Sequence, residues 1–247
     1  MFESPLILLW GIGTIFLASV VSGLTGFGFA LVAVPLLMIF LPPKVVVPTV
    51  LMLSLSGGFA VLFETKKWID LKRIWPLIIA GVATSPLGAY LLLILDVDML
   101  KTLIGVVIVI SALALFTGFR LHIKNEKLGF VLVGFASGLL AGSTGMGGPP
   151  TILFFSNQRA EKQVFRANLR IFFTALGSSS ILSQLVGGLV TKDALTYYVW
   201  FLPVLLVGIL LGIKLAQIVS ETTFRKATLV IVAVSGLAAI FSGLEIF

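Results

Sequence analysis

Long apolar runs separated by short charged loops occupy almost the whole chain. Most runs have the roughly 20 residues that an α-helix needs to cross about 30 Å of hydrocarbon. They are continuously apolar and do not alternate with polar residues as the strands of a membrane β-barrel do. The pattern predicts an all-α polytopic membrane protein. The expected segments are Pro5–Leu41, Val45–Phe63, Ile74–Leu95, Met99–Phe119, Leu128–Asn157, Ala167–Val190, Ala194–Val219 and Ala227–Phe247.

The same glycine motif interrupts two of these segments. The pattern Gly-x-Thr-Gly-x-Gly begins at Gly23 and again at Gly142, 119 residues later. Glycine adopts left-handed turns at no steric cost, so the helix is expected to break at both places. Paired breaks at matching places in the two halves of a membrane protein point to the binding site of a transporter.

The distribution of lysine and arginine indicates how the broken segments cross the membrane. If each were a single kinked span, the 17 basic residues would divide 8 to 9 between the two sides. If each enters and returns, as two short helices or a re-entrant hairpin, 14 fall on one side and three, Lys44, Lys101 and Lys192, on the other. The positive-inside rule favours the returning arrangement and makes the basic side cytoplasmic. Both termini are then expected on the extracytoplasmic side of the cell (inner) membrane.

An internal repeat accompanies the glycine motif. Three sets of residues match in order: Pro48–Gly58 with Ala167–Gly177 at the offset of 119, Pro76 and Gly81 with Pro203 and Gly208 at 127, and Lys101–Ser111 with Arg225–Ser235 at 124. With a returning pair plus three full spans, each half has an odd number of passes, so the halves are expected to be inverted repeats. We place repeat one at about 1–119 and repeat two at about 128–247, within one membrane-embedded domain, 1–247, of about 8–10 membrane segments.

Composition agrees with a chain whose main solvent is lipid. The mean hydropathy is +1.18, and 59% of the residues are apolar but only 11% charged. The net charge of +7 is interpreted as a topological signal, so no nucleic acid partner is expected. One histidine, His122, and no cysteine leave no metal site, cofactor or catalytic residue to predict. A homo-oligomer is compatible with the sequence.

The helices that resume after the glycine motifs are expected to form an anion site. Their first N–H groups have no partner within the helix and lie at the positive end of the helix dipole. Thr25 and Thr144 would add hydroxyl donors, the aligned pair Thr49 and Asn168 would flank the site, and Arg170 would receive an oxyanion. The candidate substrate-binding residues are Gly23, Thr25, Gly26, Phe27, Gly28, Gly142, Thr144, Gly145, Met146, Gly147, Gly148, Thr49, Asn168 and Arg170.

Structural alternatives remain for several of these residues. Glycines also serve tight packing between membrane helices, and this is the preferred interpretation of Gly81-x-x-x-Ser85 and Gly208-x-x-x-Gly212. Arg166 and Arg170 share one helix face, from which both could reach lipid phosphates. That role is preferred for Arg166, whereas for Arg170 the lipid-facing and the anion-binding roles stay balanced. Apart from two residues at span ends, the apolar segments hold no acidic residue, so no carboxylate site for Na⁺ or H⁺ is visible.

The residues around both motifs resemble a known family. The paired signature of the TauE/SafE, or TSUP, sulfite exporter-like transporters is similar to Gly23-Leu-Thr-Gly-Phe-Gly-Phe-Ala-Leu-Val-Ala-Val-Pro35-Leu and Gly142-Ser-Thr-Gly-Met-Gly-Gly-Pro149. The resemblance covers the whole chain and implies an inner-membrane permease for small sulfur-containing anions such as sulfite, thiosulfate or organosulfonates. Phe27 and Phe29 depart from the commoner triple-glycine form, and the second motif has a double proline where one is usual.

The sequence therefore predicts alternating access around a midplane site made of two helix N-termini, with the two halves rocking about it. Export is favoured because the membrane potential drives an anion outward by about 2.3 kcal/mol per charge per 100 mV without a coupling ion. An anion channel of the same architecture is the alternative. A membrane-embedded enzyme is the weaker alternative, because the sequence shows no nucleophile–base or metal-ligand cluster.

Overall fold

A computed structural model of the chain describes residues 5–116, 125–156 and 161–218. In these ranges every regular element is a helix, which confirms the predicted all-α class. The helices are α1 Pro5–Thr25, α2 Phe29–Met38, α3 Pro43–Thr65, η1 Lys66–Trp68, α4 Leu71–Ile94, α5 Val97–Phe116, α6 Glu126–Thr144, α7 Gly148–Ser156, α8 Lys162–Val186 and α9 Lys192–Ile218. Length and apolar composition make α1, α4, α6, α8 and α9 candidate membrane spans. The predicted segment Ala227–Phe247, the repeat match Arg225–Ser235, His122 and the chain termini lie outside the described residues.

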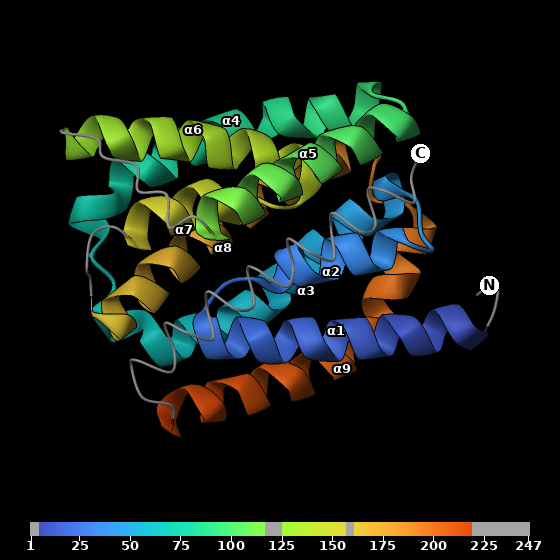
Figure 1. The fold of residues 1–247 in the computed structure, drawn as a ribbon, viewed down its shortest axis with the longest axis horizontal. Coiled ribbons are helices and arrows are strands. Elements are labelled where there is room, and N and C mark those ends of the chain that lie inside the picture. The colour runs from blue at the N-terminus through green and yellow to red at the C-terminus, as the bar shows by residue number, and fades with distance from the viewer. Residues whose placement is uncertain (1–4, 117–124, 157–160, 219–247) are drawn as a thin grey trace.

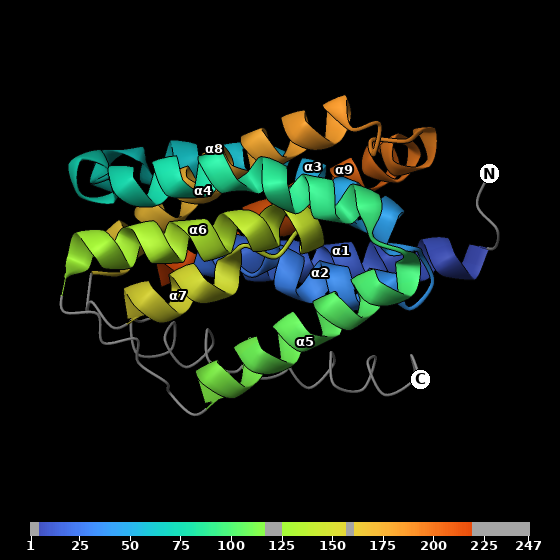
Figure 2. The ribbon, with the colours of Figure 1, turned by 90° about the horizontal axis from the view of Figure 1, so that it is seen from above.

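Both glycine-interrupted segments return on themselves, as the returning arrangement requires. After α1 the chain turns at residues 26–28 and α2 runs back, and α6 and α7 repeat this course around residues 145–147 (Figures 1 and 2). The returning arms are short, with 10 residues in α2 and 9 in α7. The entering arms are longer than the predicted short helices, with 21 residues in α1 and 19 in α6. Isolated glycines do not end a membrane helix, so each entering arm continues until the motif itself.

The helix ends fall into two groups. The first turns of α4, α6 and α8 lie at the left end of the molecule in Figure 1, and those of α3, α5 and α9 at the right end. Lys44, Lys101 and Lys192, the three basic residues predicted to stand apart, lie at or near the starts of α3, α5 and α9. At the other end Arg73 of α4 forms an ion pair with Glu126 of α6, with 2.6 Å between Nη2 and Oε1. Among the described residues, the basic side chains are therefore divided as the charge pattern predicted.

Two helix pairs pack with their backbones in contact. Helix α1 lies against α9, and α6 lies against α4 (Figure 1). A Cβ atom added at Gly212 of α9 would lie 2.9 Å from Cα of Gly23 on α1. A Cβ atom added at Gly88 of α4 would lie 2.9 Å from Cα of Gly142 on α6. Small residues permit such close approach between membrane helices, so these glycines determine which helices pair.

The packed glycines indicate an alignment of α4 with α9 that differs from the one suggested by the sequence. Gly81 and Gly208 both pack against neighbouring helices, which confirms the packing role predicted for them. They are not equivalent positions, however. By their contacts with the first helix of each half, Gly88 corresponds to Gly212 and Thr84 to Gly208, an offset of 124 residues instead of 127. Isolated glycines are common in apolar helices, so two of them can be aligned by chance. A close contact between two backbones is possible at one alignment only, and it is therefore the stricter criterion.

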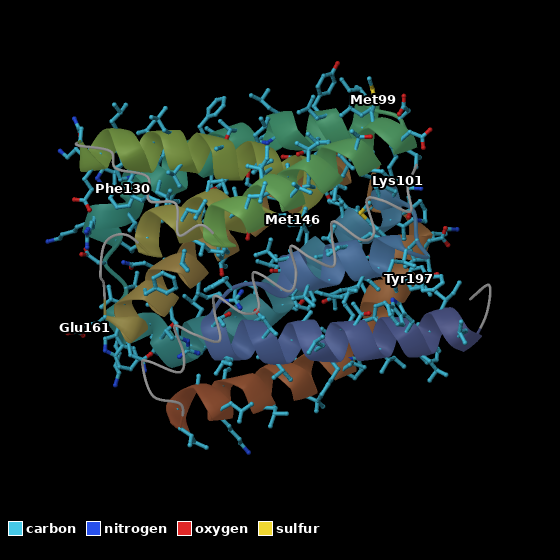
Figure 3. All side chains as sticks on the ribbon, in the orientation of Figure 1. Met99, Lys101, Phe130, Met146, Glu161 and Tyr197 are labelled. Atoms are coloured by element: carbon cyan, nitrogen blue, oxygen red, sulfur yellow. The ribbon has the colours of Figure 1, made fainter. Side chains whose placement is uncertain are left out.

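The outer surface of the helices is apolar. Exposed large hydrophobic side chains include Leu6, Phe63, Trp75 and Val199, and apolar side chains project outward along the described helices (Figure 3). Apolar groups at an outer surface are stable in hydrocarbon and unfavourable in water. The surface therefore fits the lipid bilayer predicted as the surrounding solvent.

Candidate functional site

The two glycine motifs form the turn from α1 to α2 and the turn from α6 to α7. Gly26, Gly28 and Gly145 have φ angles of 84°, 87° and 74°. Only glycine adopts this left-handed region without a steric penalty from Cβ. Each turn is closed by one backbone hydrogen bond, from the Gly26 N–H to the Ser22 carbonyl at 2.8 Å and from the Gly145 N–H to the Ala141 carbonyl at 3.0 Å. The glycines thus allow both chains to reverse inside the bundle.

The threonines of the motifs brace these turns. The hydroxyl oxygen of Thr25 accepts from the Phe27 N–H, and that of Thr144 accepts from the Met146 N–H, both at 3.2 Å. The Thr144 hydroxyl also donates to a carbonyl one turn earlier in its helix at 2.7 Å, and the Thr25 hydroxyl is shared between the Phe27 carbonyl at 2.6 Å and a carbonyl one turn earlier at 2.9 Å. Neither threonine is among the residues that line the cavity between the turns. The structure therefore places both as supports of the turn, although the sequence suggested direct donors to a substrate.

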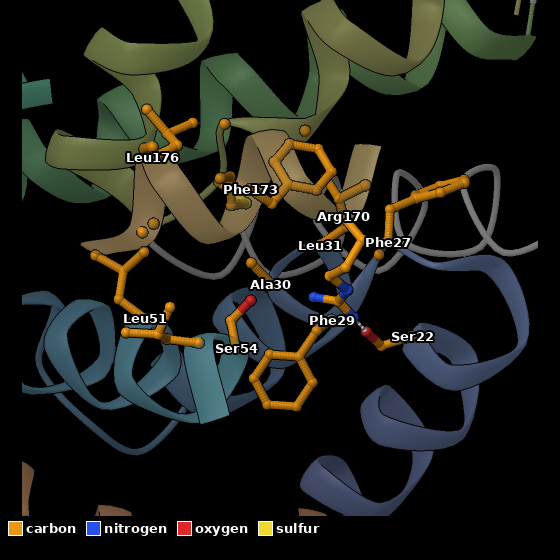
Figure 4. Close-up of a pocket in the computed structure, with 18 residues that line it drawn as sticks. Ser22, Phe27, Phe29, Ala30, Leu31, Leu51, Ser54, Arg170, Phe173 and Leu176 are labelled. Carbon is orange, nitrogen blue, oxygen red and sulfur yellow. Dashed lines mark hydrogen bonds between the residues drawn. The ribbon is translucent and has the colours of Figure 1, made fainter. Parts of the chain in front are cut away.

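A cavity of about 50 Å³ lies between the two turns (Figure 4). One water molecule needs about 10–15 Å³ on this scale, so the cavity has room for a small anion. Half of the predicted site residues line it: Phe27, Gly28, Gly145, Met146, Gly147, Gly148 and Arg170. The remaining lining residues are Ser22, Phe29, Ala30, Leu31, Leu51, Ser54, Leu55, Ala141, Phe173, Leu176 and Gly177. The two motifs meet in space, and α3 and α8 complete the wall.

Two buried arginines of α8 reach the turn between α1 and α2. Arg170 is 2% exposed and lines the cavity; its Nη2 donates to the Ser22 hydroxyl oxygen at 2.9 Å, and its Nε has no partner among the described residues. Arg166 is 0% exposed, donates from Nη2 to the Gly23 carbonyl at 2.9 Å, and packs against Gly26. The lipid-facing interpretation preferred for Arg166 is therefore wrong. Both side chains are buried where α8 meets the end of α1, so neither is exposed to lipid.

The two short helices present unequal N-termini to the cavity. The N–H groups of residues 28–31 at the start of α2 have no acceptor among the described residues. At the start of α7, Pro149 and Pro150 occupy the second and third positions and carry no N–H. The sequence predicted two similar helix N-termini. In the structure they differ, because the start of α2 offers more free N–H groups than the start of α7.

Thr49 and Asn168 lie away from the cavity. The Thr49 hydroxyl is shared between two carbonyls, Ala194 at 3.2 Å and Val45 of its own helix at 2.8 Å, and Oδ1 of Asn168 accepts from the Asp70 N–H at 2.9 Å. The bond to Ala194 ties α3 to the start of α9, and the bond from Asp70 ties α8 to the residue before α4. Thr49 and Asn168 were predicted to flank the anion site. Their hydrogen bonds instead join neighbouring helices. The glycine that begins each motif packs against α9 or α4, as described above.

A comparison with models of known protein families gives a match. The family model described as Sulfite exporter TauE/SafE matches residues 11–239. The chain belongs to this family. Membership confirms the resemblance carried by the two glycine motifs, and with the five candidate spans it identifies a multi-pass membrane transporter. No curated protein and no solved structure matches the chain.

In this TauE/SafE transporter, the offset of 119 residues also relates much of the cavity wall, including residues that sequence reasoning missed. A lone serine in an apolar helix usually serves helix contacts, so Ser22 and Ser54 carried no signal of their own. Applied to the predicted site residues, the offset leads from Gly148 to Phe29 and from Arg170 to Leu51 but reaches neither serine. Applied to the lining residues, it shows how much of the wall is related. It gives six pairs, Ser22/Ala141, Phe27/Met146, Gly28/Gly147, Phe29/Gly148, Leu51/Arg170 and Ser54/Phe173.

Proposed function

We propose that this TauE/SafE protein is an inner-membrane permease for small sulfur-containing anions such as sulfite, thiosulfate or an organosulfonate. The observation that carries the proposal is the donor-rich cavity between the glycine turns. It combines the Arg170 guanidinium, the Ser22 and Ser54 hydroxyls and the free N–H groups of residues 28–31, and none of the lining residues carries a carboxylate. A buried cation and N–H groups at a helix N-terminus favour an oxyanion.

Outward transport is the proposed direction. The membrane potential drives an anion out of the cell by about 2.3 kcal/mol per charge per 100 mV, so export proceeds without a coupling ion. The lining residues include no acidic side chain that would bind Na⁺ or H⁺ for coupled import.

We infer that the units that move are not the two sequence halves. Rocking of the halves would pull α1 from α9 and α4 from α6, the two pairs whose backbones touch at glycines. The hydrogen bonds of Thr49 and Asn168 likewise join α3 to α9 and α8 to α4. These contacts support one body made of α1, α2, α3 and α9, and a second made of α4, α6, α7 and α8. The cavity, the packing of α3 against α8 and the hydrogen bonds from the two arginines of α8 to α1 lie between the two bodies.

Transport of labelled sulfite and thiosulfate into proteoliposomes tests the role of Arg170. Arg170→Gln is expected to lower the initial rate about tenfold or more, because hydrogen bonds to a charged group are worth about 1.5–3 kcal/mol and a neutral amide cannot replace the charge. Arg170→Lys, which retains the charge, should recover part of the rate. Arg73→Gln is the matched control, since Arg73 pairs with Glu126 at a partly exposed site outside the cavity.

The proposal fails if Arg170→Gln melts like the wild type and transports both anions at the wild-type rate. Flux that saturates and supports exchange of internal for external anion identifies a carrier. Flux that rises linearly with concentration and shows no exchange identifies the anion channel.

A further inference from the structure

The cavity has two ends that differ in chemistry although they occupy matching positions in the chain. Ser22 and Arg170, joined by a hydrogen bond, form one end. The residues 119 positions away are Ala141 and Leu51, and both also line the cavity. Figure 4 shows Leu51 and Leu176 on the side away from Ser22 and the Arg170 guanidinium. One end of the cavity is therefore polar, and the other is mainly apolar, with Ser54 as its one polar side chain among the lining residues.

The polar end offers hydrogen-bond donors and one positive charge. The Ser22 oxygen accepts from Arg170, which leaves the Ser22 hydroxyl hydrogen for another acceptor. Nε of Arg170 is buried and has no partner among the described residues. The free N–H groups of residues 28–31 begin α2 beside these two side chains. A buried donor without an acceptor is unfavourable, so an oxyanion head group completes this end.

The apolar end disfavours a second charge. The side chains of Leu51, Ala141 and Leu176 neither donate nor accept hydrogen bonds. Pro149 and Pro150 remove two of the N–H groups that the start of α7 would otherwise present. A charged group held here would find fewer donors than at the polar end, namely the Ser54 hydroxyl and the N–H groups of Gly147 and Gly148, whereas an alkyl group gains from burial.

We propose that the cargo is an amphiphilic monoanion bound in one orientation. Its oxyanion head contacts Ser22 and Arg170, and its short alkyl substituent contacts Leu51 and Ala141. This proposal rests on the proposed function and narrows it, because an inorganic dianion such as sulfate would place its second charge against the apolar end. Alkanesulfonates and short carboxylates share this chemistry.

Methanesulfonate and sulfate form a matched pair of ligands, because a methyl group in the first replaces a charged oxygen in the second. Thermal unfolding of the purified full-length protein measures both, since a bound ligand raises the melting temperature according to its Kd. Methanesulfonate is expected to bind at least about tenfold more tightly than sulfate. Ethanesulfonate should gain about fourfold more from one further buried methylene group. Acetate and propionate, measured alongside, distinguish a carboxylate head from a sulfonate head.

Variants at the two ends test the orientation. Leu51→Asn puts a polar group of similar size at the apolar end and should remove the advantage of methanesulfonate over sulfate. Ser22→Ala removes a donor at the polar end and should weaken both anions together. Ser56→Ala is the matched control, because the Ser56 hydroxyl bonds to the Met52 carbonyl and to Tyr198 and does not line the cavity.

The test compares the affinities of one variant for methanesulfonate and for sulfate. Their ratio does not change when a substitution lowers the stability of the fold, so a destabilised variant still tests the proposal. Sulfate binding as tightly as methanesulfonate in the wild type, or an unchanged ratio in Leu51→Asn, overturns the amphiphile proposal and leaves the anion permease in place. If no anion shifts the melting temperature, both proposals fail.

Discussion

Thr25 and Thr144 occupy equivalent places in the two glycine turns, and each closes its turn with one hydroxyl group. The oxygen accepts from an N–H two residues later, and the hydrogen is donated to a nearby backbone carbonyl. The sequence places both residues in the turns. It does not show which way the hydroxyl faces, because rotation about χ1 chooses between the backbone and the cavity.

Thr25→Val is expected to lower the free energy of unfolding by about 1–3 kcal/mol, because valine keeps the shape but leaves the Phe27 N–H without its acceptor. Thermal unfolding in detergent measures the change, and Thr25→Ser, which retains the hydroxyl, should stay close to the wild type. A Thr25→Val protein that melts like the wild type but no longer binds anions would show that the hydroxyl contacts the substrate instead.

At the scale of helices, α8 holds both glycine turns. Near its start Arg166 donates to the Gly23 carbonyl, and near its end Nε2 of Gln184 donates to the Gly142 carbonyl at 3.1 Å. These carbonyls belong to residues 119 positions apart, so one helix contacts equivalent atoms in both halves. Polar residues in the predicted segment could have faced lipid headgroups or the interior. Their burial became evident only when the neighbouring helices were in place.

The pairing of α1 with α9 depends on a lack of side chains at their contact. Gly212→Ala is expected to destabilise the protein by about 1–3 kcal/mol, because the added Cβ would lie 2.9 Å from Cα of Gly23 on a rigid backbone. Gly105→Ala on α5 is the matched control, since no atom lies within 4 Å of its added Cβ, and it should be neutral or stabilising by about 0.5–1 kcal/mol. Equal melting temperatures for the two variants would show that the α1–α9 contact tolerates separation.

At the scale of the whole molecule, the contacts join helices across the sequence halves. Helices α1 and α9 come from different halves, as do α4 and α6, yet each pair makes a close backbone contact. The cavity lies where the two proposed bodies face each other, which is where relative motion would open it to one side or the other.

The chain has no cysteine, so every introduced disulfide is unambiguous. Ser85→Cys with Ser179→Cys links α4 to α8, where the two serine hydroxyl oxygens lie 2.7 Å apart, and transport should continue after oxidation because both helices belong to one proposed body. Gly58→Cys with Thr174→Cys links α3 to α8 across the two bodies, and transport should stop until a reductant is added. A Cβ atom added at Gly58 would lie 3.3 Å from the Thr174 hydroxyl oxygen. Loss of transport on linking α4 to α8 would instead support rocking of the sequence halves.

Features that depend on one segment and its solvent were determined by the sequence alone. Lipid requires every spanning backbone group to be paired within the chain, so apolar runs become helices and glycine clusters become the breaks. The positive-inside rule likewise predicted, from the loop sequences alone, that most basic residues lie at one end of the molecule. It also placed Arg170 and the two motifs as candidates for one site.

Only the tertiary structure decided which helices pair, that Arg166 is buried, and that one end of the cavity is polar and the other mainly apolar. Each of these depends on contacts between segments that are far apart in the chain, such as Arg166 with Gly23 and Arg170 with Ser22. Within a single apolar helix, all faces carry similar residues, so periodicity does not identify the face that meets a partner. That face is selected by the fit of backbones at glycines and by the need of buried polar groups for partners.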